Sequence, residues 1–223
     1  MMRKMSKKKP FILHDNYYNS RISQEGLTAY GAGWRNRNII KTPFGLHWLT
    51  IPIQHKSLSQ KIQDVQVADM NWNKRHWKTI CQNYSSAKYF HEYECRFKKL
   101  YMDCKTKYLS EINIRFIHSI NEFLNIKTNI SNVSDYNIGI GKSERLVELC
   151  KKLGANEYIS GYSAIDYLDT GLFMEEGIKV TWMNYSGYPV YNQLWPPFNH
   201  NVSIIDLVFA KGPDSSGYFK SVQ

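Results

Sequence analysis

The sequence predicts an α/β protein with a mostly parallel, Rossmann-like sheet flanked by helices. Helical and strand-like segments alternate with short connections between about residues 142 and 185, which is typical of a parallel sheet. Ahead of them, residues 71 to about 124 repeat their apolar side chains at the three- and four-residue steps of helices. A β-hairpin is expected before this helical middle section.

Length and composition favour one folded unit. The chain has 223 residues, of which 43% are hydrophobic and 22% charged, as in globular proteins. No internal repeat divides it, so we expect residues 11–223 to form a single domain. Residues 1–10 are rich in lysine and arginine and lack the apolar core of a signal peptide, so we expect a disordered basic leader there.

The charge balance indicates the class of partner. With 29 Lys and Arg against 19 Asp and Glu, the formal charge of +10 favours anions such as phosphates, nucleotides or nucleic acid. No apolar run is long enough to span a membrane, and we expect a cytoplasmic protein. The 4 cysteines show no CxxC spacing, so they are expected to be reduced thiols, and neither a metal nor a cofactor is expected.

The first predicted elements are a strand and a hairpin. In "PFILHDNYY" a short apolar run meets polar groups, as in a buried strand that delivers His14 and Asp15 to the edge of a sheet. Catalytic groups often lie at such strand ends. Further on, "TPFG" separates two β-branched, apolar runs, and Pro43 and Gly45 suit a tight turn. We therefore expect a hairpin with arms near 36–42 and 46–53.

Residues 71–84, "NWNKRHWKTICQNY", predict an amphipathic helix. At about 100° per residue, Trp77, Ile80 and Tyr84 fall on one buried face. His76 lies at the flank of that face and is a candidate general base. The opposite face carries Lys74, Arg75 and Lys78, and it is either a solvated surface or an anion site.

The later elements offer further candidates. "KSERLVELCKK" predicts a helix whose first turn is capped by the Ser143 hydroxyl, and this helix start is also a candidate phosphate site. Gly154 is expected to end that helix before the strand "EYISG". Ligands of open parallel sheets bind beyond the strand ends, so the candidate substrate-binding residues there are Ser160, Tyr191 and Gln193.

The segment "WRNRN" has an unusual polar pattern. Arg35 and Arg37 alternate with Asn36 and Asn38, so an extended strand would place the arginines on one face and the asparagines on the other. Guanidinium groups suit bidentate binding of phosphate or carboxylate, and amides suit a sugar or base. The alternative interpretation is a polar, exposed strand face.

Six segments, in this order along the chain, resemble the WbqC-like family, whose members are encoded in bacterial O-antigen and other surface-polysaccharide gene clusters. The segments are "WRNRNIIKTPFGLHWLTIPI", "NWNKRHWKTICQNYSSAKYF", "KSERLVELCKKLGANEYISG", "DYLDTGLF", "PVYNQLW" and "VSIIDLVF". Family members usually begin with a strand bearing a Gln-Pro-x-Tyr-x-Pro-type motif, where this chain has "MMRKMSKKKP".

The resemblance implies a role in building surface glycans on a nucleotide-activated sugar. We therefore expect a transferase that moves an acyl or aminoacyl group onto a nucleotide-linked amino sugar. Arg35, Arg37 and Lys74 would bind phosphate, Lys78 is a further candidate substrate-binding residue, and Asn36 and Asn38 would orient the sugar or acyl group. His76 or His14 would act as general base, and Asp15 would either orient that base or bind sugar hydroxyls. The alternative is a non-catalytic module that binds RNA or an acidic glycan, suggested by the basic charge and 16 tyrosines.

Overall fold

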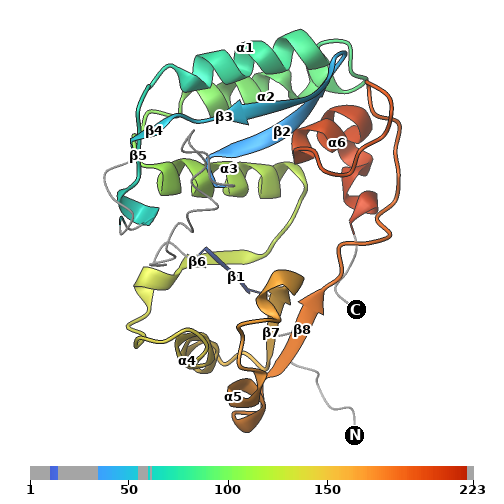
Figure 1. Cartoon of the computed structure of the whole chain (residues 1–223). Helices are drawn as coiled ribbons and strands as arrows, with labels where there is room; N and C mark the ends of the chain where they lie inside the picture. Colours follow the sequence, from blue (N-terminus) through green and yellow to red (C-terminus); the bar gives the residue numbers. More distant parts are fainter. Residues whose placement is uncertain (1–10, 15–34, 55–59, 61, 220–223) are drawn as a thin grey trace, which may run out of the picture. The chain divides into compact units, whose positions relative to one another are not determined.

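The computed structural model describes residues 11–14, 35–54, 60 and 62–219 (Figure 1). The chain divides into two compact units. Unit 1 contains the described residues up to Ser131 and also Pro189–Phe219, whereas unit 2 contains Asn132–Tyr188. The predicted organisation of residues 11–223 as a single domain stays a prediction, and each unit is described by itself.

The predicted hairpin is confirmed in unit 1. Strand β2 (Arg37–Thr42) pairs antiparallel with β3 (Gly45–Thr50), and Thr42 lies opposite Gly45. The turn places Gly45 at a φ of 108°, a conformation that a side chain disfavours. The Thr42 hydroxyl also accepts a hydrogen bond from the backbone N–H of Phe44 and so stabilises the turn.

The helical middle section is also confirmed. It consists of α1 (Trp72–Tyr84), α2 (Phe90–Met102) and α3 (Leu109–Phe123), and α6 (Ile204–Lys211) joins them from the end of the chain. Aromatic rings hold these helices together across one core. Tyr101 of α2 lies 4.9 Å from Phe116 of α3, and Phe97 of α2 lies 5.1 Å from Phe209 of α6, measured between ring centroids.

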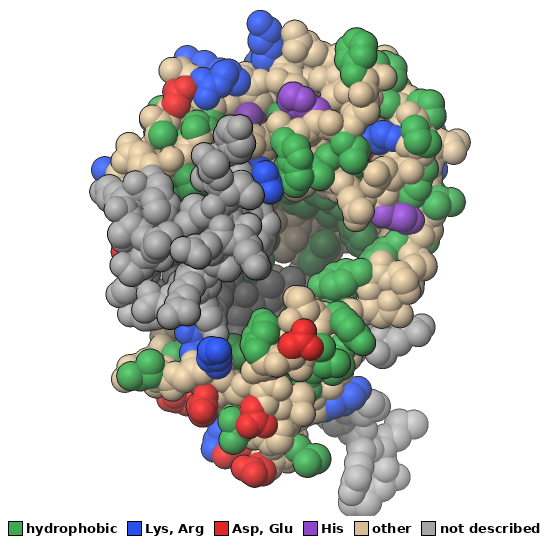
Figure 2. Space-filling view, viewed as in Figure 1, with side chains coloured by type: hydrophobic (Ala, Val, Ile, Leu, Met, Phe, Trp, Pro, Cys, Tyr) green, Lys and Arg blue, Asp and Glu red, His purple; other side chains and the backbone are tan. Residues whose placement is uncertain are grey.

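Helix α1 has the faces that its sequence predicts. Trp77, Ile80 and Tyr84 are at most 8% exposed and belong to the core. His76 is buried as well, because α1 packs its flank against the end of β3. The basic residues Lys74, Arg75 and Lys78 are exposed, and Figure 2 shows Lys and Arg side chains gathered over α1 at the top of the view.

Short elements complete unit 1. Strand β1 (Phe11–His14), at the position predicted for the first strand, pairs with β6 (Asn129–Asn132). Strands β4 (Ile53–Gln54) and β5 (Gln66–Val67) form a second small antiparallel pair. The 3₁₀ helices η1 (Ile62–Asp64) and η4 (Gly212–Tyr218) lie before β5 and after α6.

Unit 2 has its own core and a parallel pair of strands. Strand β7 (Glu157–Gly161) pairs in parallel with β8 (Lys179–Met183). Around them lie α4 (Glu144–Lys152), α5 (Thr170–Glu175) and the 3₁₀ helices η2 (Val133–Asp135) and η3 (Tyr162–Ala164). Gly154 ends the turn after α4 at a φ of 61°, as the sequence predicts.

The protein is a mixed α/β structure, but the predicted mostly parallel, Rossmann-like sheet is not what the described residues form. Their strands make four two-stranded sheets, of which β7–β8 is parallel and β2–β3 and β4–β5 are antiparallel. The predicted alternation of helix and strand is limited to one crossover connection, in which α5 lies between the parallel strands β7 and β8. The segments between β3 and β6 fold mainly as helices and so supply no further parallel strands to the pair.

Candidate ligand-binding site

A cavity in unit 1 brings together residues that the sequence singles out far apart. Its volume is about 620 Å³, which is within the usual range of small-molecule sites. We call it the arginine cavity. Its polar lining includes Arg35, Asn36, Arg37, Asn38 and His76. The start of the hairpin and helix α1 therefore line the same site. The rest of the lining is mostly apolar and comes from β3, α2, α3 and α6.

The predicted alternation of the "WRNRN" side chains is incomplete. Strand β2 begins only at Arg37, so Arg35 and Asn36 lie in the turn before it, and all four side chains line the cavity. The guanidinium carbon of Arg37 lies 4.2 Å from the centre of the Trp48 ring, a cation–π contact that restrains this side chain. The buried Asn36 side chain donates from Nδ2 to the backbone oxygen of Ile51 at 3.0 Å.

Three buried polar atoms of residues that line the cavity have no protein partner. Asn36 is 3% exposed and Trp72 is 1% exposed. Within the described part of the chain, Asn36 Oδ1 accepts no hydrogen bond, and neither Trp72 Nε1 nor Arg37 Nε donates one. A buried polar group without a partner is costly, so these atoms mark positions where a ligand or water would be stabilised.

His76 is held in a defined state. Its Nε2 lies 2.9 Å from the backbone oxygen of Thr50, which can only accept, so Nε2 carries the proton and Nδ1 the lone pair. Burial lowers the pKa of His76, the hydrogen bond to Thr50 opposes this shift, and the nearby charge of Arg75 adds to it. The imidazole is therefore neutral at pH 7, as a general base requires.

The other basic candidates lie elsewhere. Lys74 and Lys78 are exposed on the outer face of α1, and neither lines the arginine cavity. Arg75 on the same face forms an ion pair with Asp69. The anion-binding role predicted for Lys74 and Lys78 stays a prediction. His14 lies in β1, but its side chain and the whole of Asp15 are outside the described residues.

The two serine candidates belong to unit 2. Ser143 does not cap α4, because its own backbone is helical, and its hydroxyl accepts a hydrogen bond from the backbone N–H of Asp169 at 2.9 Å. It is 3% exposed and acts as a structural link between α4 and the loop before α5. Ser160 is 8% exposed within β7, opposite Trp182 in the register of the parallel pair.

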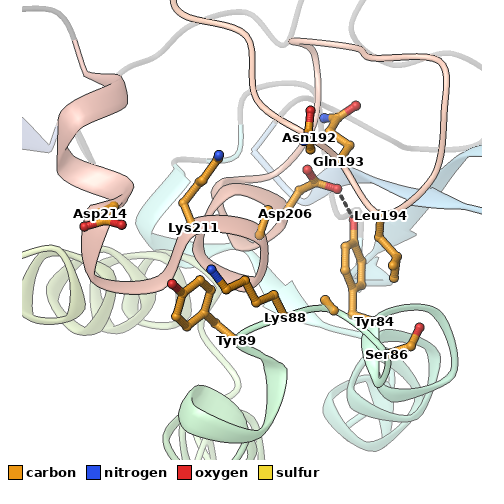
Figure 3. Close-up of a pocket in the computed structure, with 12 residues that line it drawn as sticks. Tyr84, Ser86, Lys88, Tyr89, Asn192, Gln193, Leu194, Asp206, Lys211 and Asp214 are labelled. Carbon is orange, nitrogen blue, oxygen red and sulfur yellow. Dashed lines mark hydrogen bonds between the residues drawn. The ribbon is translucent and has the colours of Figure 1, made fainter.

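A second cavity, of about 510 Å³, lies on the other side of α6, and we call it the aspartate cavity. Its deepest polar group is Asp206, which is 1% exposed. Tyr84 donates to Asp206 Oδ2 at 2.8 Å, and Tyr191 donates to Oδ1 at 2.9 Å. Figure 3 shows Lys88 and Lys211 on the side of Asp206 away from Tyr84.

We call Asp206, Tyr84, Tyr191 and Gln193 the aspartate cluster, and further hydrogen bonds connect Gln193 to the rest of it. Gln193 exchanges two bonds with the backbone of Asn199, each 2.8 Å long, and lies 3.4 Å from the Tyr191 hydroxyl. Burial raises the pKa of Asp206, and the two tyrosine hydrogen bonds oppose this rise. Burial and the Asp206 charge raise the pKa of Tyr84 and of Tyr191. Tyr191 and Gln193, predicted to bind substrate, are thus parts of this cluster.

Sequence reasoning did not single out Asp206 and assigned Tyr84 only to the core. One signal was present, because "SIIDLVF" places an acid inside an apolar run. An acid at such a position is usually paired or functional.

The described residues contain neither a candidate metal site nor a membrane-spanning helix. No group of three or more His, Cys, Asp or Glu side chains in them is arranged to hold a metal ion. Likewise, no helix in the described ranges has the length and apolar character needed to cross a bilayer.

The fold and cavities define a mixed α/β protein with sites of small-molecule size. The comparisons identify its family. The WbqC-like protein family matches residues 29–218, and the chain belongs to this family. It is also 42% identical over 188 residues to the uncharacterized protein Rv1507c of Mycobacterium tuberculosis (strain ATCC 25618 / H37Rv), covering 84% of this chain and 81% of that protein. No solved structure matches the chain.

Proposed function

We propose that this chain is a transferase of surface-polysaccharide biosynthesis that moves an acyl group onto a nucleotide-linked amino sugar. The main support for this proposal is the arginine cavity, in which Arg35, Arg37 and the neutral His76 line one mostly apolar space. The family resemblance supplies the glycan context, and the net charge of +10 favours a phosphate-bearing substrate.

In this mechanism the arginines bind the phosphates of the nucleotide sugar, because guanidinium groups form paired, charge-assisted bonds to phosphate. The sugar amine then attacks the acyl carbonyl, and His76 Nδ1 takes the proton that the amine loses. The Thr50 oxygen keeps Nε2 protonated, so the lone pair that accepts this proton is on Nδ1. Apolar walls exclude water and limit hydrolysis of the acyl donor.

Isothermal titration calorimetry with a UDP-linked amino sugar tests whether the two arginines bind phosphate. We expect Arg35→Ala and Arg37→Ala to weaken binding about tenfold or more, since each removes a hydrogen-bonded charge. Lys78→Ala is the matched control, because Lys78 is exposed and outside the cavity lining. No heat with any nucleotide sugar would contradict the proposal, and salt-dependent retention of total tRNA on filters would support an RNA-binding module instead.

A further inference from the structure

The apolar part of the arginine cavity extends beyond what a sugar or a phosphate needs. Phe97 of α2 and Ile112, Phe116, Ile117 and Ile120 of α3 line it together. The four side chains of α3 come from successive turns, so they form a strip along the helix rather than a single contact point. Such a strip suits an elongated hydrocarbon group.

Of the three polar atoms without partners, Arg37 Nε belongs to the guanidinium group assigned to the phosphate, and the other two add a more specific requirement. Asn36 Oδ1 is an acceptor and Trp72 Nε1 is a donor, and both residues line this cavity. An amide offers the matching pair, since its N–H donates and its carbonyl oxygen accepts. The product of acyl transfer to an amine is an amide. His76, the proposed base, lies close to this pair, with its ring centroid 5.2 Å from that of Trp72.

We infer that the transferred group is a linear acyl chain of several carbons, which lies along the α3 strip with its carbonyl between Asn36 and Trp72. This inference rests on the proposed function and names its acyl substrate class. Arg35 and Arg37 hold the anionic end of the acceptor, and Trp72 Nε1 donates to the carbonyl oxygen as negative charge develops on it. Asn36 Oδ1 accepts from the attacking amine and orients it.

The donor in this scheme is an acyl thioester. The amine nitrogen forms the new C–N bond, the C–S bond breaks with its electron pair, and the thiolate leaves. The proton from the amine passes to His76 Nδ1 and then to the thiolate, so a thiol is released and no oxidant or reductant is needed.

N-acylglycines are suitable probes, because each combines a carboxylate, an amide and an acyl chain. Titration calorimetry with a series from acetyl to decanoyl should show affinity rising about fourfold per added methylene until the strip is filled. An Ile117→Trp substitution should shorten the best-binding chain, whereas Ile114→Trp, on the same helix but outside the cavity lining, should not.

The amide contacts are tested separately. Replacing the ligand amide by an ester removes only its N–H, and we expect about fivefold weaker binding to the unaltered protein. Trp72→Phe keeps an aromatic ring but removes the donor, and it should weaken the amide and ester ligands by a similar factor. The ester comparison needs no protein variant, so it is decisive even if Trp72→Phe folds poorly.

The outcomes separate this inference from the proposed function. Affinity that is independent of chain length, or equal for amide and ester, would overturn the inference even if nucleotide sugars bind. Chain-length-dependent binding of acylglycines without any binding of nucleotide sugars would support the acyl site and overturn the proposed acceptor.

Discussion

The hydroxyl of Tyr84 ties helix α1 to helix α6, and its removal should be costly. It donates to Asp206 Oδ2 at 2.8 Å and accepts from the backbone N–H of Lys41 at 2.9 Å. A bond to a charged group contributes about 1.5–3 kcal/mol, and a buried N–H left without a partner costs about 1–3 kcal/mol. Allowing for relaxation, we expect Tyr84→Phe to lower the free energy of unfolding by about 3 kcal/mol.

Urea unfolding of the full chain at pH 7, followed by circular dichroism, measures this loss. Tyr93→Phe is the matched control, because Tyr93 is a buried tyrosine of the same core whose hydroxyl makes no hydrogen bond to any described residue. The control should change stability by less than about 0.5 kcal/mol. Equal small losses for the two variants would refute the role assigned to the Tyr84 hydroxyl.

Three further predictions concern backbone fit and titration. Gly212→Ala should destabilise the protein by about 2 kcal/mol or more in urea unfolding, because the new Cβ would lie 2.5 Å from the Tyr89 ring at a φ of 54°, whereas Gly217→Ala should have little effect. Burial raises the pKa of Asp206 in the folded state, so the free energy of unfolding of the wild type should fall as pH rises above the ordinary Asp pKa of 3.8. The Asp206→Asn variant should lack this fall, and parallel pH profiles of the two proteins would contradict the prediction. The free energy of unfolding of the wild type should fall, relative to that of His76→Gln, as pH drops below 6.5 towards the lowered pKa of His76. A difference between the two proteins that does not change with pH would argue against a buried, neutral imidazole.

Local patterns in the sequence predicted much of the fold. The turn "TPFG", the helical periodicity from residue 71 and the glycine after α4 each depend on nearby residues, and each is confirmed. The sheet was predicted wrongly because strand pairing depends on long-range contacts. A helix followed by a strand fits a two-stranded parallel pair as well as a large parallel sheet.

In the candidate sites, too, local patterns were predicted and long-range contacts were not. Chemical type and spacing singled out the "WRNRN" residues and His76, and the structure places them around one cavity. By contrast, the pairing of Tyr84 with Asp206 joins residues 122 positions apart, so no local pattern predicts it. Their bond is visible only after α1 and α6 have packed. Ser143 does not cap α4, because its own backbone is helical, and its hydroxyl instead accepts from the distant backbone N–H of Asp169.

The two cavities share their framework, which gives the aspartate cluster a role in ligand binding. Helix α1 supplies His76 to the arginine cavity and Tyr84 to the aspartate cavity, eight residues or about 12 Å apart along the axis. Helix α6 likewise supplies Ile205 to the first and Asp206 to the second. The Tyr84–Asp206 hydrogen bond therefore joins two helices that both line the arginine cavity. We expect acylglycine affinity to fall in Tyr84→Phe although Tyr84 does not line that cavity.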